Sequence, residues 1–101
     1  MLELSTHLTF IYDPGHGWLR VPLTEIAALG LEAEISVCSY IEGQYAYLEE
    51  DCDCPLYIGT RLLHGCSRPE ITEEYVEQFA RPSLHFGHAA LSPAFWEHWR
   101  R

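Results

Sequence analysis

The sequence predicts one α+β domain, with a small, mainly antiparallel sheet and two or three short helices. The chain has 101 residues, the size of a single domain, and 48% of them are hydrophobic, which is enough to bury a core. Short segments rich in β-forming residues alternate with short helical patterns, and glycine or proline separates most of them. We expect the core within about residues 7–65 and a C-terminal extension over residues 66–101.

The first expected elements are two strands and a helix. Residues 7–12 (HLTFIY) and 18–21 (WLRV) are rich in side chains that favour extended backbone. Between them, residues 13–17 (DPGHG) predict a tight turn, because proline fixes φ and the two glycines permit left-handed backbone. Pro22 suits the first turn of a helix, and residues 23–29 place leucine and isoleucine on one helical face.

A β-hairpin and a second helix are expected next. Residues 34–41 (EISVCSYI) and 44–49 (QYAYLE) alternate in the manner of paired strands, and the Glu-Gly pair at 42–43 is typical of a hairpin turn. Asp53 is expected to cap a helix over residues 54–63, which has a proline in its first turn and a glycine beyond its end.

The C-terminal third gives weaker signals. Residues 70–79 (EITEEYVEQF) fit a helix and a strand nearly equally well. Residues 80–94 contain two prolines and a glycine and predict an irregular connection. Residues 95–101 predict a short helix or an extended aromatic tail, which either docks back on the domain or clasps a partner.

The chain is strongly acidic. Fifteen aspartates and glutamates face six basic residues, all of them arginine, and the formal net charge is −9. Residues 42–77 hold nine of the acids and two of the arginines. Such a chain cannot build the large basic face that DNA phosphates require, so we expect no direct nucleic-acid binding. The expected partner is a basic protein surface or a metal ion.

Location and cysteine chemistry are linked. No apolar run reaches the roughly 18 residues that a membrane-spanning helix needs, and the first residues lack a signal-peptide pattern. We therefore expect a cytoplasmic protein without membrane contact. In that compartment, the four cysteines are expected to be thiols or metal ligands rather than disulfides.

Two pairs of residues suggest zinc as an alternative to a protein without a cofactor. Cys52 and Cys54, followed by His64 and Cys66, are ligands of the type that tetrahedral zinc takes. Against this site, a helix over residues 55–63 would separate the two pairs by roughly 13 Å at ~1.5 Å per residue. The other interpretation is that the cysteines are small hydrophobic residues and the histidine is exposed. We expect no cofactor, with zinc as the alternative.

Catalysis is the less favoured hypothesis. Asp13 and His16, together with the acids of residues 49–53, would supply acid–base groups if they converged on one cleft. The simpler interpretation is that Asp13 and His16 stabilise a tight turn and that the acids surround a helix N-terminus. Because no nucleophile triad, phosphate-binding glycine loop or zinc-protease motif is present, we expect a protein that is not an enzyme.

Two strings in the first half resemble a group of small uncharacterised proteins of phages, plasmids and other mobile elements. They are DPGHGWL at residues 13–19 and YLEEDCD at residues 47–53, and the resemblance covers about residues 8–60. The group carries one cysteine in the second string, so Cys54 is a departure from it. The resemblance implies a mobile-element origin and brings no established activity with it.

A broader pattern is similar to swapped-hairpin (AbrB-like) transcription factors and antitoxins. Residues 18–49 show their order of strand, proline, helix, Leu-Gly and hairpin. The resemblance implies a homodimer. Those proteins bind DNA through basic residues around the proline and the helix, where this chain has Arg20 against Glu25, Glu32 and Glu34.

The leading hypothesis is a mobile-element accessory protein that binds other proteins through an acidic surface. Small acidic phage proteins often block host nucleases or immune complexes, so the expected role is an inhibitor of the anti-CRISPR or anti-restriction kind. The alternatives are a zinc-stabilised structural module and an AbrB-like dimeric regulator. The residues predicted to contact the partner are Glu49, Glu50, Asp51, Asp53, Glu70, Glu73, Glu74 and Glu77, with Trp96 and Trp99 as aromatic anchors.

Overall fold

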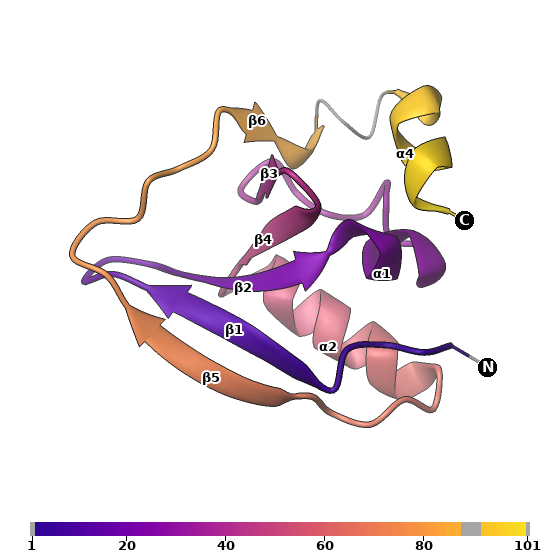
Figure 1. Cartoon of the computed structure of the whole chain (residues 1–101), viewed down its shortest axis with the longest axis horizontal. Helices are drawn as coiled ribbons and strands as arrows, with labels where there is room; N and C mark the ends of the chain where they lie inside the picture. Colours follow the sequence, from indigo (N-terminus) through magenta and orange to yellow (C-terminus); the bar gives the residue numbers. More distant parts are fainter. Residues whose placement is uncertain (1, 88–91, 101) are drawn as a thin grey trace.

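One twisted sheet organises the protein (Figure 1). The computed structural model describes residues 2–87 and 92–100. Within them, the strands follow the spatial order β5-β1-β2-β4-β3-β6, and all pairs are antiparallel except β1 with β5. The predicted α+β class is therefore confirmed. The strands are β1 (His7–Tyr12), β2 (Gly17–Pro22), β3 (Tyr40–Glu42), β4 (Tyr45–Glu49), β5 (Glu70–Tyr75) and β6 (Leu84–His85); the helices are α1 (Leu23–Ala28), α2 (Asp53–Leu63) and α4 (Pro93–Trp99).

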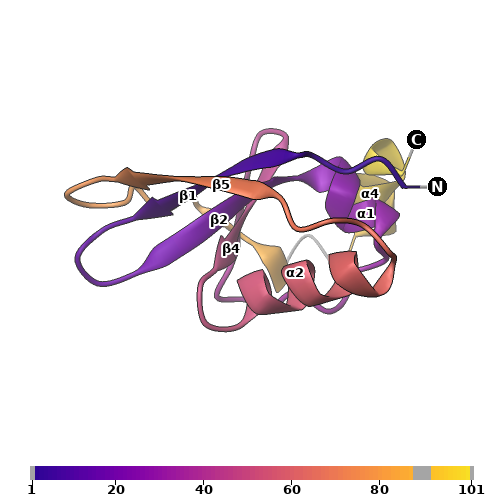
Figure 2. The ribbon, with the colours of Figure 1, turned by 90° about the horizontal axis from the view of Figure 1, so that it is seen from below.

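The main core lies between the sheet and the helices. Alternate side chains of β2 and β4 point to this face, and α2 runs along it (Figure 2). Each helix contributes buried side chains to the same cluster, including Ile26, Tyr57 and Trp96. Both chain ends lie near α1 and α4 (Figures 1 and 2). None of the described helices is long and apolar enough to cross a membrane.

The opposite face of the sheet carries a smaller aromatic cluster. Ile11, Trp18 and Tyr47 are buried there although none of the described helices covers them. The segment after β5 covers them instead, because the Phe79 ring stacks on Trp18 with ring centroids 4.2 Å apart. This contact fixes the chain as it passes from β5, at one edge of the sheet, to β6, at the other (Figure 1).

A buried polar network links the helices to the N-terminal segment. The Tyr57 hydroxyl donates to Glu25 Oε1 at 2.7 Å, and Arg61 Nη1 donates to the Tyr57 hydroxyl at 3.0 Å. Ser5 donates to the same carboxylate, and Arg61 Nε donates to the Ser67 carbonyl. Burial, and then the hydrogen bond to Glu25, raises the pKa of Tyr57. These bonds satisfy groups that would be costly to bury unpaired.

The predicted strand over residues 34–41 is largely wrong. Only Tyr40–Glu42 pairs as β3, and turns and bends occupy most of residues 31–39. The cause is Asp53, whose carboxylate accepts hydrogen bonds from the Ser36 N–H at 3.0 Å and from the Ser36 and Ser39 hydroxyls. Asp53 therefore holds this loop against α2 and does not cap the helix, where the N-cap position is Cys52.

Most other elements follow the sequence. The first strand agrees with residues 7–12, and the helices predicted over 23–29 and 54–63 agree to within one residue. The segment that fits helix and strand equally well forms β5. Residues 80–94 are less irregular than expected because they contain β6 and the start of α4.

The C-terminal tail forms helix α4, so of the two predictions for this segment the short helix is confirmed. Residues 88–91 and 101, for which an irregular connection and the end of the tail were predicted, lie outside the described residues.

One glycine has a different role from the one predicted. Neither Gly15 nor Gly17 has a positive φ, so the turn at residues 13–17 uses ordinary backbone. A Cβ at position 17 would lie 2.3 Å from Cζ of Phe10, because the Phe10 ring, on the neighbouring strand β1, lies over the glycine. Gly17 therefore allows the close approach of the Phe10 ring and does not serve a left-handed conformation.

Candidate functional site

The outer edge of the sheet carries a row of acidic side chains. All six residues of β5 are exposed, and they include Glu70, Glu73 and Glu74. Side chains alternate along a strand, so Glu70 and Glu74 share the aromatic-cluster face and Glu73 lies on the helix face. Glu77 follows directly and is also exposed. We call these four residues the acidic row.

The arginines of the described segments do not neutralise the acidic row. In residues 2–87 and 92–100, the ion pairs within 4 Å join Arg61 to buried Glu25 and Arg100 to Glu32. Arg20 and Arg81 lie over aromatic rings instead. The negative field at this edge is therefore open to another molecule.

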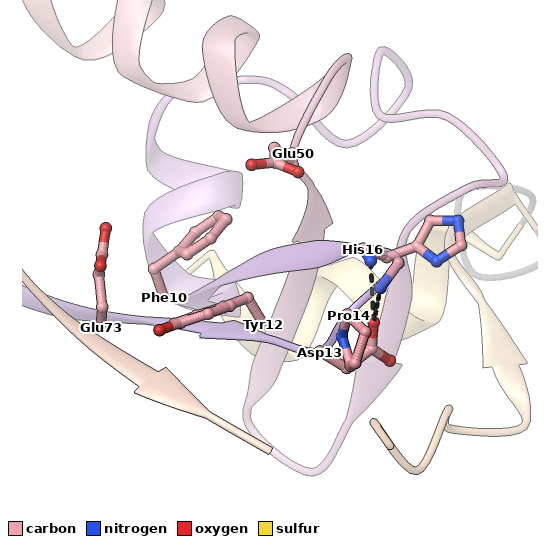
Figure 3. Close-up of a pocket in the computed structure, with 8 residues that line it drawn as sticks. Phe10, Tyr12, Asp13, Pro14, His16, Glu50 and Glu73 are labelled. Carbon is pink, nitrogen blue, oxygen red and sulfur yellow. Dashed lines mark hydrogen bonds between the residues drawn. The ribbon is translucent and has the colours of Figure 1, made fainter. Parts of the chain in front are cut away.

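A hollow of about 330 Å³ adjoins the acidic row on the helix face. Glu50 and Glu73 border it, with the rings of Phe10 and Tyr12 between them (Figure 3). Tyr75 meets Tyr12 edge-on, with ring centroids 5.4 Å apart. Carboxylates beside aromatic faces are suited to an ammonium or guanidinium group, which pairs with the former and lies over the latter.

Asp13 and His16 line the same hollow but do not form an acid–base pair. The Asp13 carboxylate accepts the N–H groups of Gly15 at 2.9 Å, His16 at 2.8 Å and Phe79 at 3.1 Å. The bond from Phe79, followed by those from Gly15 and His16, lowers the pKa of Asp13. The His16 ring points away from Glu50 (Figure 3) and lies near Trp18 instead. The interpretation of Asp13 as a turn residue is confirmed.

Of the other predicted acids, Glu50 borders the hollow beside the acidic row, but Glu49 and Asp51 lie apart from the row. Glu49 and Asp51 line a second hollow of about 400 Å³, together with Trp18 and Tyr40 of the aromatic-cluster face. The Glu49 carboxylate accepts the N–H groups of Asp51 and Cys52. Glu49 therefore supports the turn before α2, and the predicted acidic surface is split between two faces of the sheet.

Two residues predicted to contact a partner are buried. Asp53 is 3% exposed and is bound to the serines of the preceding loop. Trp96 is 1% exposed and packs against Phe86, with ring centroids 5.5 Å apart. Both predictions are wrong because the fold uses these side chains internally. Trp99 is half-buried against the same core, so the tail docks back on the domain.

The predicted zinc ligands are not brought together. Cys52 and Cys54 lie at the start of α2, and His64 and Cys66 lie beyond its end, so its 11 residues separate the pairs by roughly 16 Å. No group of three or more His, Cys, Asp or Glu side chains in the described segments is placed to hold a metal ion. Burial, and then the charges of Glu50 and Glu49, raises the pKa of the Cys54 thiol, so this side chain is a protonated thiol at neutral pH. As a shared zinc site, this ligand set is wrong.

The aromatic part of the hollow was missed at the sequence level. Phe10 and Tyr12 were treated as β-forming residues, although two aromatics two positions apart share one face of a strand. Tyr75 could not be placed, because it reaches Tyr12 only through the parallel pairing of β5 with β1.

Comparison with known proteins adds no relative to this picture. No protein family, no curated protein and no solved structure matches the chain significantly. The resemblances to mobile-element proteins and to swapped-hairpin domains therefore stay predictions, and the proposals below depend on the chemistry of the chain itself.

Proposed function

We propose that this chain acts by binding a basic surface of a host defence complex or nuclease through its acidic row. In this role it is an accessory protein of a phage or another mobile element. The host-directed part of the proposal rests on the resemblance of residues 13–19 and 47–53 to mobile-element proteins. The binding chemistry rests on the structure of the sheet edge.

The observation that supports binding is the exposure of four glutamates within residues 70–77 without an ion-paired arginine in the described part of the chain. These carboxylates make no ion pair within the described segments, so their charges add no such contact to the fold. A cationic partner would supply the missing counter-charge. Such a field also speeds encounter with an oppositely charged surface.

The same charges explain why a nucleic-acid-handling protein is the expected target. A groove that binds phosphates presents arginine and lysine donors, and carboxylates accept the same charge-assisted hydrogen bonds. Glu70 and Glu74 lie on one face at a spacing of roughly 13 Å, from ~3.3 Å per residue. A row of exposed carboxylates can therefore occupy a phosphate-binding groove and exclude its ligand.

The test compares two variants of equal charge. One carries Glu70→Gln, Glu73→Gln and Glu74→Gln. The other carries Glu34→Gln, Glu42→Gln and Glu97→Gln, which are exposed elsewhere. Each variant changes the net charge from −9 to −6, because three negative charges are removed. Proteins captured from a host lysate are identified, and the affinity of each purified candidate is measured at about 0.05 and about 0.5 M salt.

A partner that fits the proposal is basic and binds the wild type and the control variant alike. Its affinity falls roughly 10-fold for the β5 variant, at about 0.5 kcal/mol per lost charge pair, and falls again at high salt. Equal losses for the two variants, or an affinity that does not respond to salt, would falsify the proposal.

A further inference from the structure

The direction of the β5 backbone shows which groups face outward. The Glu70 N–H donates to the Thr6 carbonyl at 2.8 Å, and the Val76 N–H donates to the Tyr12 carbonyl at 2.9 Å. In an extended strand, the N–H and C=O of one residue point to the same side and alternate along the chain. The even-numbered residues of β5 therefore face β1.

It follows that Ile71, Glu73 and Tyr75 direct their N–H and C=O groups away from the sheet. No strand in residues 2–87 and 92–100 pairs with that edge, and none of these six groups has a hydrogen-bond partner there. The other edge strand, β6, has only two residues. The outer edge of β5 is thus the longer unpaired edge of the described sheet, and it coincides with the acidic row.

We propose that a basic strand of the partner adds to this edge as a seventh strand, antiparallel to β5. This inference rests on the proposed function and specifies how the acidic row recognises its partner. Strand addition gains affinity from main-chain hydrogen bonds and selectivity from alternate side chains. Antiparallel pairing is expected because it is slightly more stable per residue than parallel pairing.

The charge of β5 determines which kind of strand can pair with its outer edge. A second copy of this chain, paired through its own β5, would place Glu73 opposite Glu73 at the centre of the new ladder, and like charges directly opposite are unfavourable. A basic strand reverses the sign of that interaction. Ile71 and Tyr75 are 43% and 54% exposed on the helix face, and they offer apolar contacts on both sides of Glu73.

The register gives the pattern of the incoming strand. Opposite Tyr75, Glu74, Glu73, Thr72, Ile71 and Glu70, it would carry apolar, basic, basic, polar, apolar and basic residues in that order. The basic residue opposite Glu73 lies on the helix face, beside the hollow lined by Phe10 and Tyr12. A guanidinium there can pair with Glu73 while it reaches the aromatic rings.

The probe is the end-capped, fluorescently labelled peptide Val-Arg-Arg-Thr-Val-Arg, titrated with the full chain. Two N-methylated forms are its matched controls. The first form is methylated at the three peptide residues that lie opposite Ile71, Glu73 and Tyr75, because the N–H groups of these peptide residues must face β5. The second form is methylated at the two peptide residues opposite Thr72 and Glu74, where the peptide N–H groups must face solvent. We expect the first to bind at least ~30-fold more weakly than the parent, because it loses three backbone hydrogen bonds, and the second to bind within ~3-fold.

A second readout is amide hydrogen exchange of β5 measured by NMR. The parent peptide should protect the amides of Ile71, Glu73 and Tyr75, which have no hydrogen-bond partner within the described part of the free chain. It should change the exchange rates of the Thr72 and Glu74 amides little. Two results overturn strand addition: no binding of the parent peptide, or equal binding of both methylated forms without new protection. In the second case the acidic row still binds cations and the proposed function stands. Peptide pairing without any salt-sensitive host partner would support the inference and contradict the proposed function.

Discussion

Replacing Asp53 by alanine should destabilise the fold far more than any change to the exposed acids around it. The carboxylate is buried and accepts hydrogen bonds from the Ser36 N–H, the Ser36 hydroxyl at 2.7 Å and the Ser39 hydroxyl. The Ser39 hydroxyl oxygen in turn accepts the Glu49 N–H at 2.9 Å. Removing the carboxylate leaves three donors without this acceptor and frees the loop before β3 from α2.

Hydrogen bonds to a charged group contribute about 1.5–3 kcal/mol each, and bonds that share one acceptor are not additive. We therefore expect Asp53→Ala to lower the free energy of unfolding by about 3 kcal/mol. In a domain of this size, that corresponds to a fall in melting temperature of about 12 °C or more. Asp53→Asn keeps an acceptor for the Ser36 N–H, so its loss should be smaller.

Urea unfolding followed by tryptophan fluorescence measures both variants, with Asp51→Ala as the control. Asp51 is exposed and lies two residues earlier, before α2, so its replacement should change the free energy of unfolding by at most about 0.5 kcal/mol. If the Asp53 and Asp51 variants unfold at the same urea concentration, the buried carboxylate does not hold the loop and this reasoning is wrong.

Three further predictions concern single contacts. Burial and Glu25 raise the pKa of Tyr57 above its ordinary 10.0, so the wild type should lose stability as pH rises beyond 10 and Tyr57→Phe should lose less. If the free energy of unfolding in urea falls equally with pH in both proteins, this prediction is contradicted. Gly17→Ala should lower the free energy of unfolding by about 1–3 kcal/mol, because the added Cβ meets the Phe10 ring. The loss should be smaller in a Phe10→Ala background, and a double-mutant cycle measures the difference. The lowered pKa of Asp13 makes its charge stabilising above pH 3.8, so the wild type should lose stability as pH falls below that value; an Asp13→Asn protein with the same acid transition would refute this.

The parts of the fold that the sequence predicts are those fixed by neighbouring residues. Both helices that were placed correctly have a proline in or beside the first turn and a glycine after the end. The first strand is rich in β-forming residues, and the hairpin partner over residues 44–49 alternates; nothing distant overrides either pattern. Local chemistry was sufficient in these segments.

The failures come from contacts between distant residues. Residues 34–41 alternate as a strand should, but Ser36 and Ser39 bond to Asp53, which is 17 and 14 residues away. Strand pairing of residues 70–75 depends on β1, more than 60 residues earlier in the chain, so their own pattern could not separate helix from strand. Burial of Trp96 likewise depends on its contact with Phe86 and on the packing of α4 against the distant helix α1.

The acidic row has two physical explanations, and reversing its charge separates them. Charged side chains on an edge strand prevent edge-to-edge association, and for that purpose either sign serves. Selection of a basic partner requires the negative sign. A variant with Glu70→Lys, Glu73→Lys and Glu74→Lys keeps three charges on the edge and changes the net charge from −9 to −3, because each substitution adds two positive units. If the row serves only to protect the edge, this variant should keep the oligomeric state of the wild type in light scattering and should bind every partner that the wild type binds. If the row selects a basic strand, the variant should still resist association but should lose the arginine-containing peptide and bind its Glu-substituted counterpart instead.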